Sequence, residues 1–502
     1  MTSEQTILIG RDAAQVSSEL ALRFGNRHGY IAGATGTGKS VSLMLLAEGF
    51  ARAGTPVFLA DVKGDLAGLS QAAAAPGEKL QQRLAKLALG GWTPQANAVV
   101  FWDLAGVLGH PVRTSVSEMG PVLLARALEL NDTQQGVLEV AFKLADDDDL
   151  LLVDLDDLRA VLTFLAEHAK EVSARYGLVA GSSIGAIQRA LLRLEQQGGR
   201  QLLGEPALQL NDLLRQDLSG RGVINILAAE QLVLRPRLYS TFLLWLLSEL
   251  FEQLPEVGDL DQPKLAFFFD EAHLLFDDCP PALRQRIEQV VRLIRSKGVG
   301  VYFCSQNPDD LPAEILGQMG NRIQHALRAY TPREQKAIKA AAESFPVNPA
   351  LDVARTITEL GVGEAVVSTL RDGGVPTPAQ RVLVAPPTCR IGTISAEERA
   401  QVMARSPVGG KYDTAINPIS AAEKLAGRAT DAPAASGDNA ATATAPTTAA
   451  GGWGGMLRDA VLGTRRRQGL LEATAKSAAR TVGNKLGQQL LRGLLGSLTR
   501  GR

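Results

Sequence analysis

The sequence predicts an α/β fold with a mostly parallel central sheet and an all-α subdomain inserted into it. Three observations support this prediction. Short, fully apolar runs recur between helical patterns, which is typical of strands buried on both faces of a parallel sheet. A glycine-rich motif at 33–40 joins the first of these runs to a helical pattern. A long stretch of helical periodicity, roughly 118–200, interrupts the alternation.

The apolar runs divide the chain into zones. They place a core domain at 31–390, after a lead-in of residues 1–30 that is too short to be a domain. Periodicity is lost over 391–455, and from about 430 the composition cannot build a core, so we expect a linker there. Residues 456–502 predict a basic, amphipathic helical tail. The expected strands are 29–32, 57–60, 99–103, 222–227, 264–269, 300–304 and 323–327.

Composition narrows the class of protein. Hydrophobic residues make up 45% of the chain and charged residues 21%, which is typical of a soluble globular protein and excludes a disordered or fibrous one. The net charge of −1 provides no global basic field, so a nucleic acid would have to be held by local patches. The three cysteines lie far apart without C-x-x-C spacing, which favours a reducing compartment over disulfides or zinc. We see no signal peptide and no run long enough to span a membrane, so we expect a cytoplasmic protein.

The motif at 33–40 has the pattern G-x-x-x-x-G-K-[ST] in a strand–loop–helix context. Its glycines allow backbone N–H groups to surround a polyphosphate, and the following helix N-terminus favours negative charge. Lys39 would reach the β and γ phosphates, and the Ser40 hydroxyl would bind Mg²⁺. The predicted nucleotide-binding residues are Gly33, Ala34, Thr35, Gly36, Thr37, Gly38, Lys39 and Ser40.

An acidic pair follows the apolar run 264–269. We expect Asp270 to hold Mg²⁺, directly or through water, and Glu271 to orient or polarise the attacking water. His273 follows on the same turn, where it would either sense the nucleotide or cap and pack the start of a helix. The acidic pair is a weak signal alone and becomes strong beside the phosphate loop.

Two further polar residues are candidates for catalysis. Gln306 follows the run 300–304, where it would sense the γ phosphate or position water, or else cap a turn. Arg322 precedes the run 323–327, and in ring ATPases such an arginine completes the active site of a neighbouring subunit. Arg328 is the second choice for that role, and a structural ion pair is the alternative for Arg322.

A charged loop follows the run 57–60. Because the carboxyl ends of parallel strands line the ligand crevice, Asp61, Lys63 and Asp65 would lie near the nucleotide or at a subunit contact. An ordinary charged loop is the alternative.

Five segments in this order resemble the HerA/FtsK group of P-loop motors, and more closely the HerA-like bacterial family that includes YjgR. They read GATGTGKS, DVKGDLAGL, FFFDEAHLLF, CSQNP and GNRIQHALRA. The resemblance covers roughly residues 5–390. It implies a RecA-like ATPase core that forms hexameric rings, uses ATP and Mg²⁺, and moves DNA, or else protein, through a central pore.

The resemblance also implies residue roles. Lys39 and Ser40 would bind nucleotide, Asp270 and Glu271 would serve metal and water, and Gln306 would be the polar sensor, with Arg322 as the finger supplied in trans. HerA carries a β-barrel before its core that docks a nuclease. Only about 30 residues precede the phosphate loop here, so a nuclease partner is not expected.

The polymer that such a motor would move is less clearly indicated. A basic stripe at 284–297 is interrupted by Glu288, which leaves DNA contact and a solvated or inter-subunit face both open. Residues 451–502 carry a net charge of +8 and could lie on a membrane, bind phosphates, or pack on this protein. We therefore expect a DNA translocase or helicase. The alternative is an ATPase that moves or remodels proteins and that could use the basic tail as a membrane anchor. A nucleotide-dependent scaffold is disfavoured by the acidic pair.

Overall fold

A large sheet, parallel in its centre, organises residues 5–258, 260–277, 281–329 and 331–431, which this computed structural model describes. The predicted tail, the low-complexity stretch from 432 and Cys279 lie outside these residues. The parallel strands follow the order β10, β3, β9, β8, β4, β7, β5, β6. They are β3 (Gly29–Ala32), β4 (Val57–Asp61), β5 (Val99–Asp103), β6 (His110–Pro111), β7 (Ile224–Ala228), β8 (Leu265–Phe269), β9 (Val299–Ser305) and β10 (Asn321–Gln324). Each of the seven predicted runs overlaps one of these strands.

Helices cover both faces of the sheet. The side chains of β8 alternate, so that Phe267 and Phe269 join one apolar layer and Ala266 and Phe268 join the other. The first layer includes α10 (Pro236–Gln253) and α12 (Pro281–Ile294), and the second includes α1 (Lys39–Arg52). This arrangement explains why the central strands are apolar throughout and do not alternate with polar residues.

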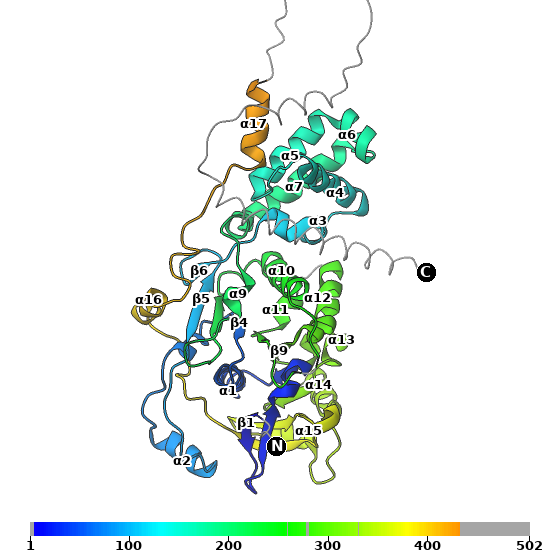
Figure 1. The fold of residues 1–502 in the computed structure, drawn as a ribbon. Helices are drawn as coiled ribbons and strands as arrows, with labels where there is room; N and C mark the ends of the chain where they lie inside the picture. Colours follow the sequence, from blue (N-terminus) through cyan, green and yellow to red (C-terminus); the bar gives the residue numbers. More distant parts are fainter. Residues whose placement is uncertain (1–4, 259, 278–280, 330, 432–502) are drawn as a thin grey trace, which may run out of the picture. The chain divides into compact units, whose positions relative to one another are not determined.

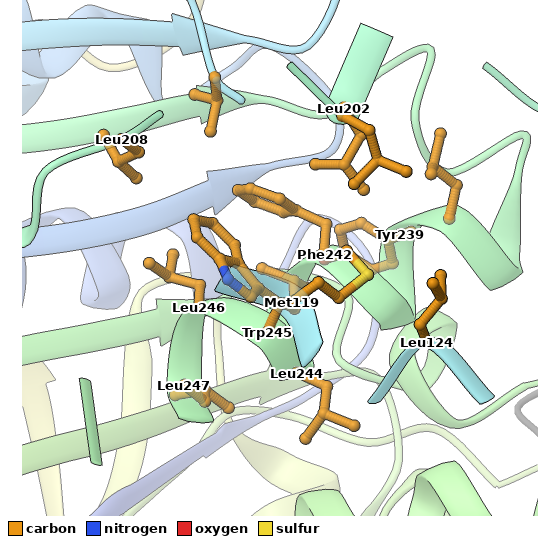
Figure 2. Packing of buried hydrophobic residues seen from close by; sticks show 14 of the residues in the cluster. Met119, Leu124, Leu202, Leu208, Tyr239, Phe242, Leu244, Trp245, Leu246 and Leu247 are labelled. Atoms are coloured by element: carbon orange, nitrogen blue, oxygen red, sulfur yellow. The ribbon is translucent and has the colours of Figure 1, made fainter. Parts of the chain in front are cut away.

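The first layer is built around the aromatic side chains of α10. Phe242 and Trp245 are buried there with Met119 and Leu124, which come from α3 (Val116–Ala127) (Figure 2). The inserted helices therefore share their apolar core with the sheet.

Antiparallel strands extend the sheet beyond β10. The added strands, in order, are β11 (Glu364–Ser368), β14 (Gln380–Val384), β1 (Thr6–Arg11) and β2 (Ser17–Ala21). A separate two-stranded sheet joins β12 (Leu370–Arg371) to β13 (Val375–Pro376). The stretch treated as a lead-in thus supplies two strands of the main sheet. Next to this extension, α14 (Pro332–Glu343) and α15 (Val353–Glu359) bury a small core with β11.

The predicted insertion is helical and lies between β6 and β7 in the chain (Figure 1). After α3 it comprises α4 (Asp132–Asp147), α5 (Leu155–Glu167), α6 (Ala169–Tyr176), α7 (Gly181–Gln196) and α8 (Gly199–Leu202). Capping boxes at Ser115, Asn131 and Asp154 begin α3, α4 and α5, because each side chain accepts a backbone N–H of the first turn.

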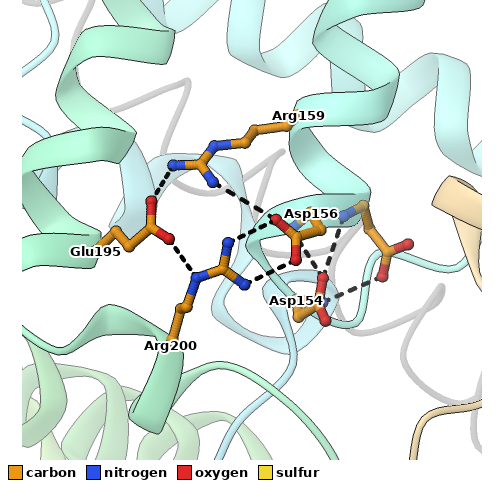
Figure 3. A network of polar contacts seen from close by, with 6 residues as sticks. Asp154, Asp156, Arg159, Glu195 and Arg200 are labelled. Carbon is orange, nitrogen blue, oxygen red and sulfur yellow. Dashed lines mark hydrogen bonds and ion pairs between the residues drawn. The ribbon is translucent and has the colours of Figure 1, made fainter.

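A network of ion pairs joins the start of α5 to α7 and α8 (Figure 3). The guanidinium of Arg200 donates to both oxygens of Asp156, at 2.7 and 2.9 Å, and its Nε donates to Glu195. Arg159 pairs with the same two acids. All four side chains remain partly exposed, so the network links helices at the surface of the insertion.

Residues 391–431 differ from the linker that the sequence predicted. They contain α16 (Ala396–Ala404) and α17 (Ala421–Asp431), and α17 lies beside α5 (Figure 1). Between them the buried ring of Tyr412 meets Trp102 edge-on at 5.3 Å, and its hydroxyl contacts Asp212. The backbone N–H of Ala422 donates to Asp157 at 2.9 Å. A few anchors therefore hold a mostly polar segment against the core.

The remaining described helices are short: α2 (Glu78–Lys86), α9 (Leu210–Leu213), α11 (His273–Phe276) and α13 (Ala313–Leu316). No helix among the described residues is both long enough and apolar enough to cross a bilayer.

Candidate active site

The glycine-rich loop connects β3 to α1 in the predicted strand–loop–helix arrangement. Gly33, Gly36 and Gly38 have φ of +151°, +77° and +120°, a region that side chains with a Cβ rarely adopt. A Cβ on Gly33 would also fall 2.5 Å from the Cβ of His325. The glycines are therefore required by the shape of the loop, whose tip at Thr35 and Gly36 is exposed.

Lys39 is the first residue of α1, and its side chain folds back over the loop. It is 7% exposed, and its Nζ donates to the Ala34 carbonyl at 3.2 Å. The Thr37 hydroxyl donates to the same carbonyl at 2.7 Å. Ser40 lies half-buried in the first turn of α1. A lysine and a hydroxyl at a helix N-terminus beside open backbone are the groups that a polyphosphate and its cation require.

A buried histidine supports the loop from β10. His325 lies 2.8 Å from the Ser42 hydroxyl through Nε2 and 2.9 Å from the Glu364 carbonyl through Nδ1. Because a carbonyl only accepts, Nδ1 carries the proton and Nε2 accepts from Ser42. Burial, with a smaller contribution from the positive charge of Lys39, lowers the pKa of His325 to about 4. The neutral ring thus ties three elements together under the loop.

The acidic pair lies at the carboxyl end of β8. Asp270 is 2% exposed, and its Oδ2 has no hydrogen-bond partner among the described residues. Burial raises the pKa of Asp270 to about 7, and the neighbouring charges of Glu271 and Asp65 add to the effect. A buried carboxylate oxygen without a partner is costly unless a cation binds it, so this residue fits the predicted role of holding Mg²⁺.

Glu271 is contacted by three side chains. Lys63 forms an ion pair with Oε1, while Gln306 Nε2 donates to Oε2 at 3.3 Å and His273 Nδ1 lies 3.3 Å from the same oxygen. Burial alone would raise the pKa of Glu271, but the hydrogen bond and charge of Lys63 outweigh burial and hold the pKa below its usual value. The positive charge of Lys39 acts in the same direction.

The loop after β4 completes this edge of the sheet. Asp61 accepts the backbone N–H groups of Gly64 at 2.7 Å and Leu66 at 3.1 Å. Burial raises the pKa of Asp61 to about 7, with Asp65 and Asp270 contributing. Carboxylate oxygens of Asp61, Asp65 and Asp270 all lie within 4.8 Å of one another. The cation-binding side of the site is therefore richer in acids than the sequence pattern of Asp270 and Ser40 predicted.

Comparison with known proteins agrees with this arrangement. The sequence matches the Helicase HerA-like C-terminal family over residues 6–502. The chain belongs to that family. It is 34% identical over 103 residues to the probable helicase MJ1565 of Methanocaldococcus jannaschii, and 31% identical over 120 residues to the probable helicase MJECL08 of the same organism. These matches cover 20% and 23% of this chain but only 18% and 21% of the relatives' own lengths.

The fold is similar to that of a bacterial conjugative coupling protein, TrwBdeltaN70. The TM-score is 0.50 at 15% sequence identity, over 78% of this chain and 93% of that one. The expected HerA-like family and the RecA-like P-loop fold with a mostly parallel sheet are both confirmed. The narrower placement beside YjgR stays a prediction.

The predicted arginine finger has a different environment from the one expected. Arg322 donates from Nε to the Met319 carbonyl at 3.2 Å and from Nη2 to the Leu316 carbonyl at 3.0 Å, so its guanidinium caps the end of α13. Arg328 follows the end of β10, is exposed, and donates to the Thr358 carbonyl. These contacts give Arg322 a structural role through backbone carbonyls, which differs from the ion pair given as its alternative.

The predicted basic stripe lies on α12 and on the turn that follows it, and it contains few exposed arginines. Arg284, Arg292 and Arg295 are exposed, whereas Arg286 is half-buried and donates to Gln289 at 2.7 Å. Arg284 also faces Glu288 at 3.4 Å. Residues 284–297 contain five basic residues against one acid, but Arg284 faces that acid and Arg286 is half-buried, so only part of this charge could contact a polyanion.

Proposed function

We propose that this protein is an ATP-hydrolysing motor of the HerA/FtsK group that moves DNA. The observation that carries the proposal is the convergence of two groups at one edge of the sheet. The first group is the glycine loop with Lys39, and the second is the buried pair of acids that follows β8. In that pair, Asp270 Oδ2 has no hydrogen-bond partner among the described residues and Glu271 is ion-paired with Lys63. Gln306 contacts the same acid.

The residues divide the work of hydrolysis. The loop from Gly33 to Ser40 holds the phosphates, and Lys39 exchanges the Ala34 carbonyl for phosphate oxygens. Ser40 and Asp270 would hold Mg²⁺, which would supply positive charge against the phosphates. Glu271 orients a water molecule for attack on the γ phosphorus and accepts a hydrogen bond from it. The bond between the γ phosphorus and the bridging oxygen breaks, and ADP and inorganic phosphate leave.

A ring supplies the rest of the site. We expect a cytoplasmic homo-hexamer in which an arginine from one subunit reaches the nucleotide of the next. Arg322 was the first candidate, but its guanidinium is part-buried and donates to two carbonyls of its own chain, whereas Arg328 is exposed and donates to one, so Arg328 fits better. Membership of a family described as helicases supports DNA as the polymer. The alternative, an ATPase that remodels proteins, is favoured only by the +8 charge of residues 451–502.

Phosphate release by the full-length protein tests both levels of the proposal. With ATP and Mg²⁺ we expect turnover that Lys39→Ala abolishes and that chelation of Mg²⁺ stops. Duplex or single-stranded DNA should raise the rate several-fold at low salt, and the rise should shrink as salt increases. Stimulation by an unfolded polypeptide and not by DNA would support the remodelling alternative. Absence of any turnover would refute the ATPase itself.

A further inference from the structure

The loop after β4 places one positively charged side chain, that of Lys63, in the candidate active site. The Lys63 ammonium forms an ion pair with Oε1 of Glu271, from a strand adjacent to the one that carries the acid. The Glu271 side chain is 3% exposed, whereas that of Lys63 is 44% exposed. The buried carboxylate of Glu271 is thus paired with a partly exposed lysine whose aliphatic stem extends inward from the surface.

The surroundings of Glu271 explain why it needs a counter-charge. Asp270 precedes it in the chain, and Asp61 and Asp65 cluster with Asp270. Like charges at this spacing repel one another strongly when water is excluded. Glu271 also has φ of +45°, which is uncommon for a residue with a side chain. The carboxylate would therefore not keep one direction without a partner on the opposite side.

The position of Lys63 is itself fixed by the loop. Asp61 accepts two backbone N–H groups of the loop, from Gly64 and Leu66. Gly64 turns the chain with φ of +75°, and the Leu66 side chain is fully buried in the apolar layer of α1. Both ends of the turn are anchored, so the lysine starts from a defined point.

We propose that Lys63 is a positioning residue for ATP hydrolysis, which holds the Glu271 carboxylate so that the oxygen shared with Gln306 faces the attacking water. This inference rests on the proposed function. Lys63 binds one carboxylate oxygen and Gln306 contacts the other, so the two side chains together fix the plane of the carboxylate. Hydrolysis is sensitive to such alignment, since a displacement of about 1 Å can cost about 100-fold in rate.

Steady-state kinetics of the full-length protein with ATP and Mg²⁺ test the proposal. Lys63→Met keeps the stem and removes the charge, and we expect kcat to fall about 10- to 100-fold with KM for ATP and nucleotide affinity within about twofold of wild type. Lys63→Arg should restore most of the rate. In a Glu271→Gln background, Lys63→Met should cause no further loss, because the residue acts through that acid. Lys143→Met, which breaks a lysine–aspartate ion pair at the surface of the insertion, should leave the rate unchanged.

Three results would overturn the proposal. A raised KM with normal kcat would assign Lys63 to phosphate binding, a raised kcat would make it a restraint on Glu271, and no change would make it a surface ion pair. Lys63→Gln replaces Lys63→Met if the latter does not fold, judged by thermal unfolding. Failure of the wild-type protein to hydrolyse ATP would count against the proposed function, whereas failure of the variants to differ would count only against the role of Lys63.

Discussion

Two clusters of charged side chains in this molecule are built in opposite ways. In the insertion, Asp156, Arg159, Glu195 and Arg200 are partly exposed and every charge has an opposite partner (Figure 3). At the carboxyl edge of the sheet, acids outnumber cations, most are buried, and Asp270 Oδ2 has no partner among the described residues. The first cluster contributes little to stability in either direction, whereas the second destabilises the folded state and is tolerated where a bound ligand can offset this cost.

The largest effect should come from removing one charge of the buried cluster without changing its size. Glu271→Gln keeps the contacts to its neighbours approximately and loses the carboxylate, so hydrolysis should fall about 100- to 1,000-fold. Nucleotide binding should persist, because the loop at 33–40 is untouched. Single-turnover phosphate release measures the first quantity and calorimetry with a non-hydrolysable ATP analogue the second. Retained turnover would mean that another group handles the water.

An intermediate effect should distinguish the two ends of β3, which are the carboxyl end that leads into the phosphate loop and the amino end on the other side of the sheet. His325 lies under the phosphate loop, and His28 precedes β3 at its other end, where it accepts the Val301 N–H at 3.0 Å. Burial lowers the pKa of both to about 4. The unfolded chain therefore binds protons at these two positions below about pH 6.5 that the folded chain does not, so the contribution of the two histidines to the free energy of unfolding should fall as the pH drops from 6.5 towards 4. The raised pKa values of Asp61 and Asp270 act in the opposite direction over the same range, so the contribution of each histidine is measured as a difference between variant and wild type.

Replacing either histidine should reduce this pH dependence. His325→Gln and His28→Gln should each lower the slope of unfolding free energy against pH by about 1 kcal/mol per pH unit between pH 6.5 and 4.5. Only His325→Gln should also weaken nucleotide binding, because it alone supports the loop. Denaturant unfolding at several pH values, with calorimetric titration at pH 7.5, gives both readouts. Equal loss of nucleotide binding in the two variants would remove the distinction between the two ends of β3.

Sequence patterns predicted the parts of this site that depend on local chain geometry. The glycines of the loop, the acids after β8 and Gln306 after β9 come together because parallel strands end at one edge. The pairing of Lys63 with Glu271 could not be read in the same way, since it depends on how Asp61 folds the intervening turn. The role of His325 could not be predicted either, because no motif in the sequence around it indicates that it contacts the helix after the phosphate loop.

The same distinction holds for the fold. Central strands were predictable because both faces are apolar, whereas β1 pairs with β14, more than 350 residues away in the chain, and β2 joins the sheet by pairing with β1. Tyr412 anchors a polar segment through one ring and one hydroxyl, a signal too sparse for periodicity to reveal. Arg322 stands where a finger was expected, but the neighbouring end of α13 occupies its guanidinium.

The smallest effect should come from the paired cluster. Arg200→Met removes two contacts to Asp156 at the start of α5 and one to Glu195 of α7, yet exposed ion pairs contribute little to folding because water screens both partners. We expect the melting temperature to fall by only about 1 °C and the ATPase rate to stay at the wild-type level. Thermal unfolding and phosphate release on the same preparation measure both. A marked loss of turnover would mean that the insertion communicates with the carboxyl edge through this network, and the contrast between structural and functional charge would then need to be abandoned.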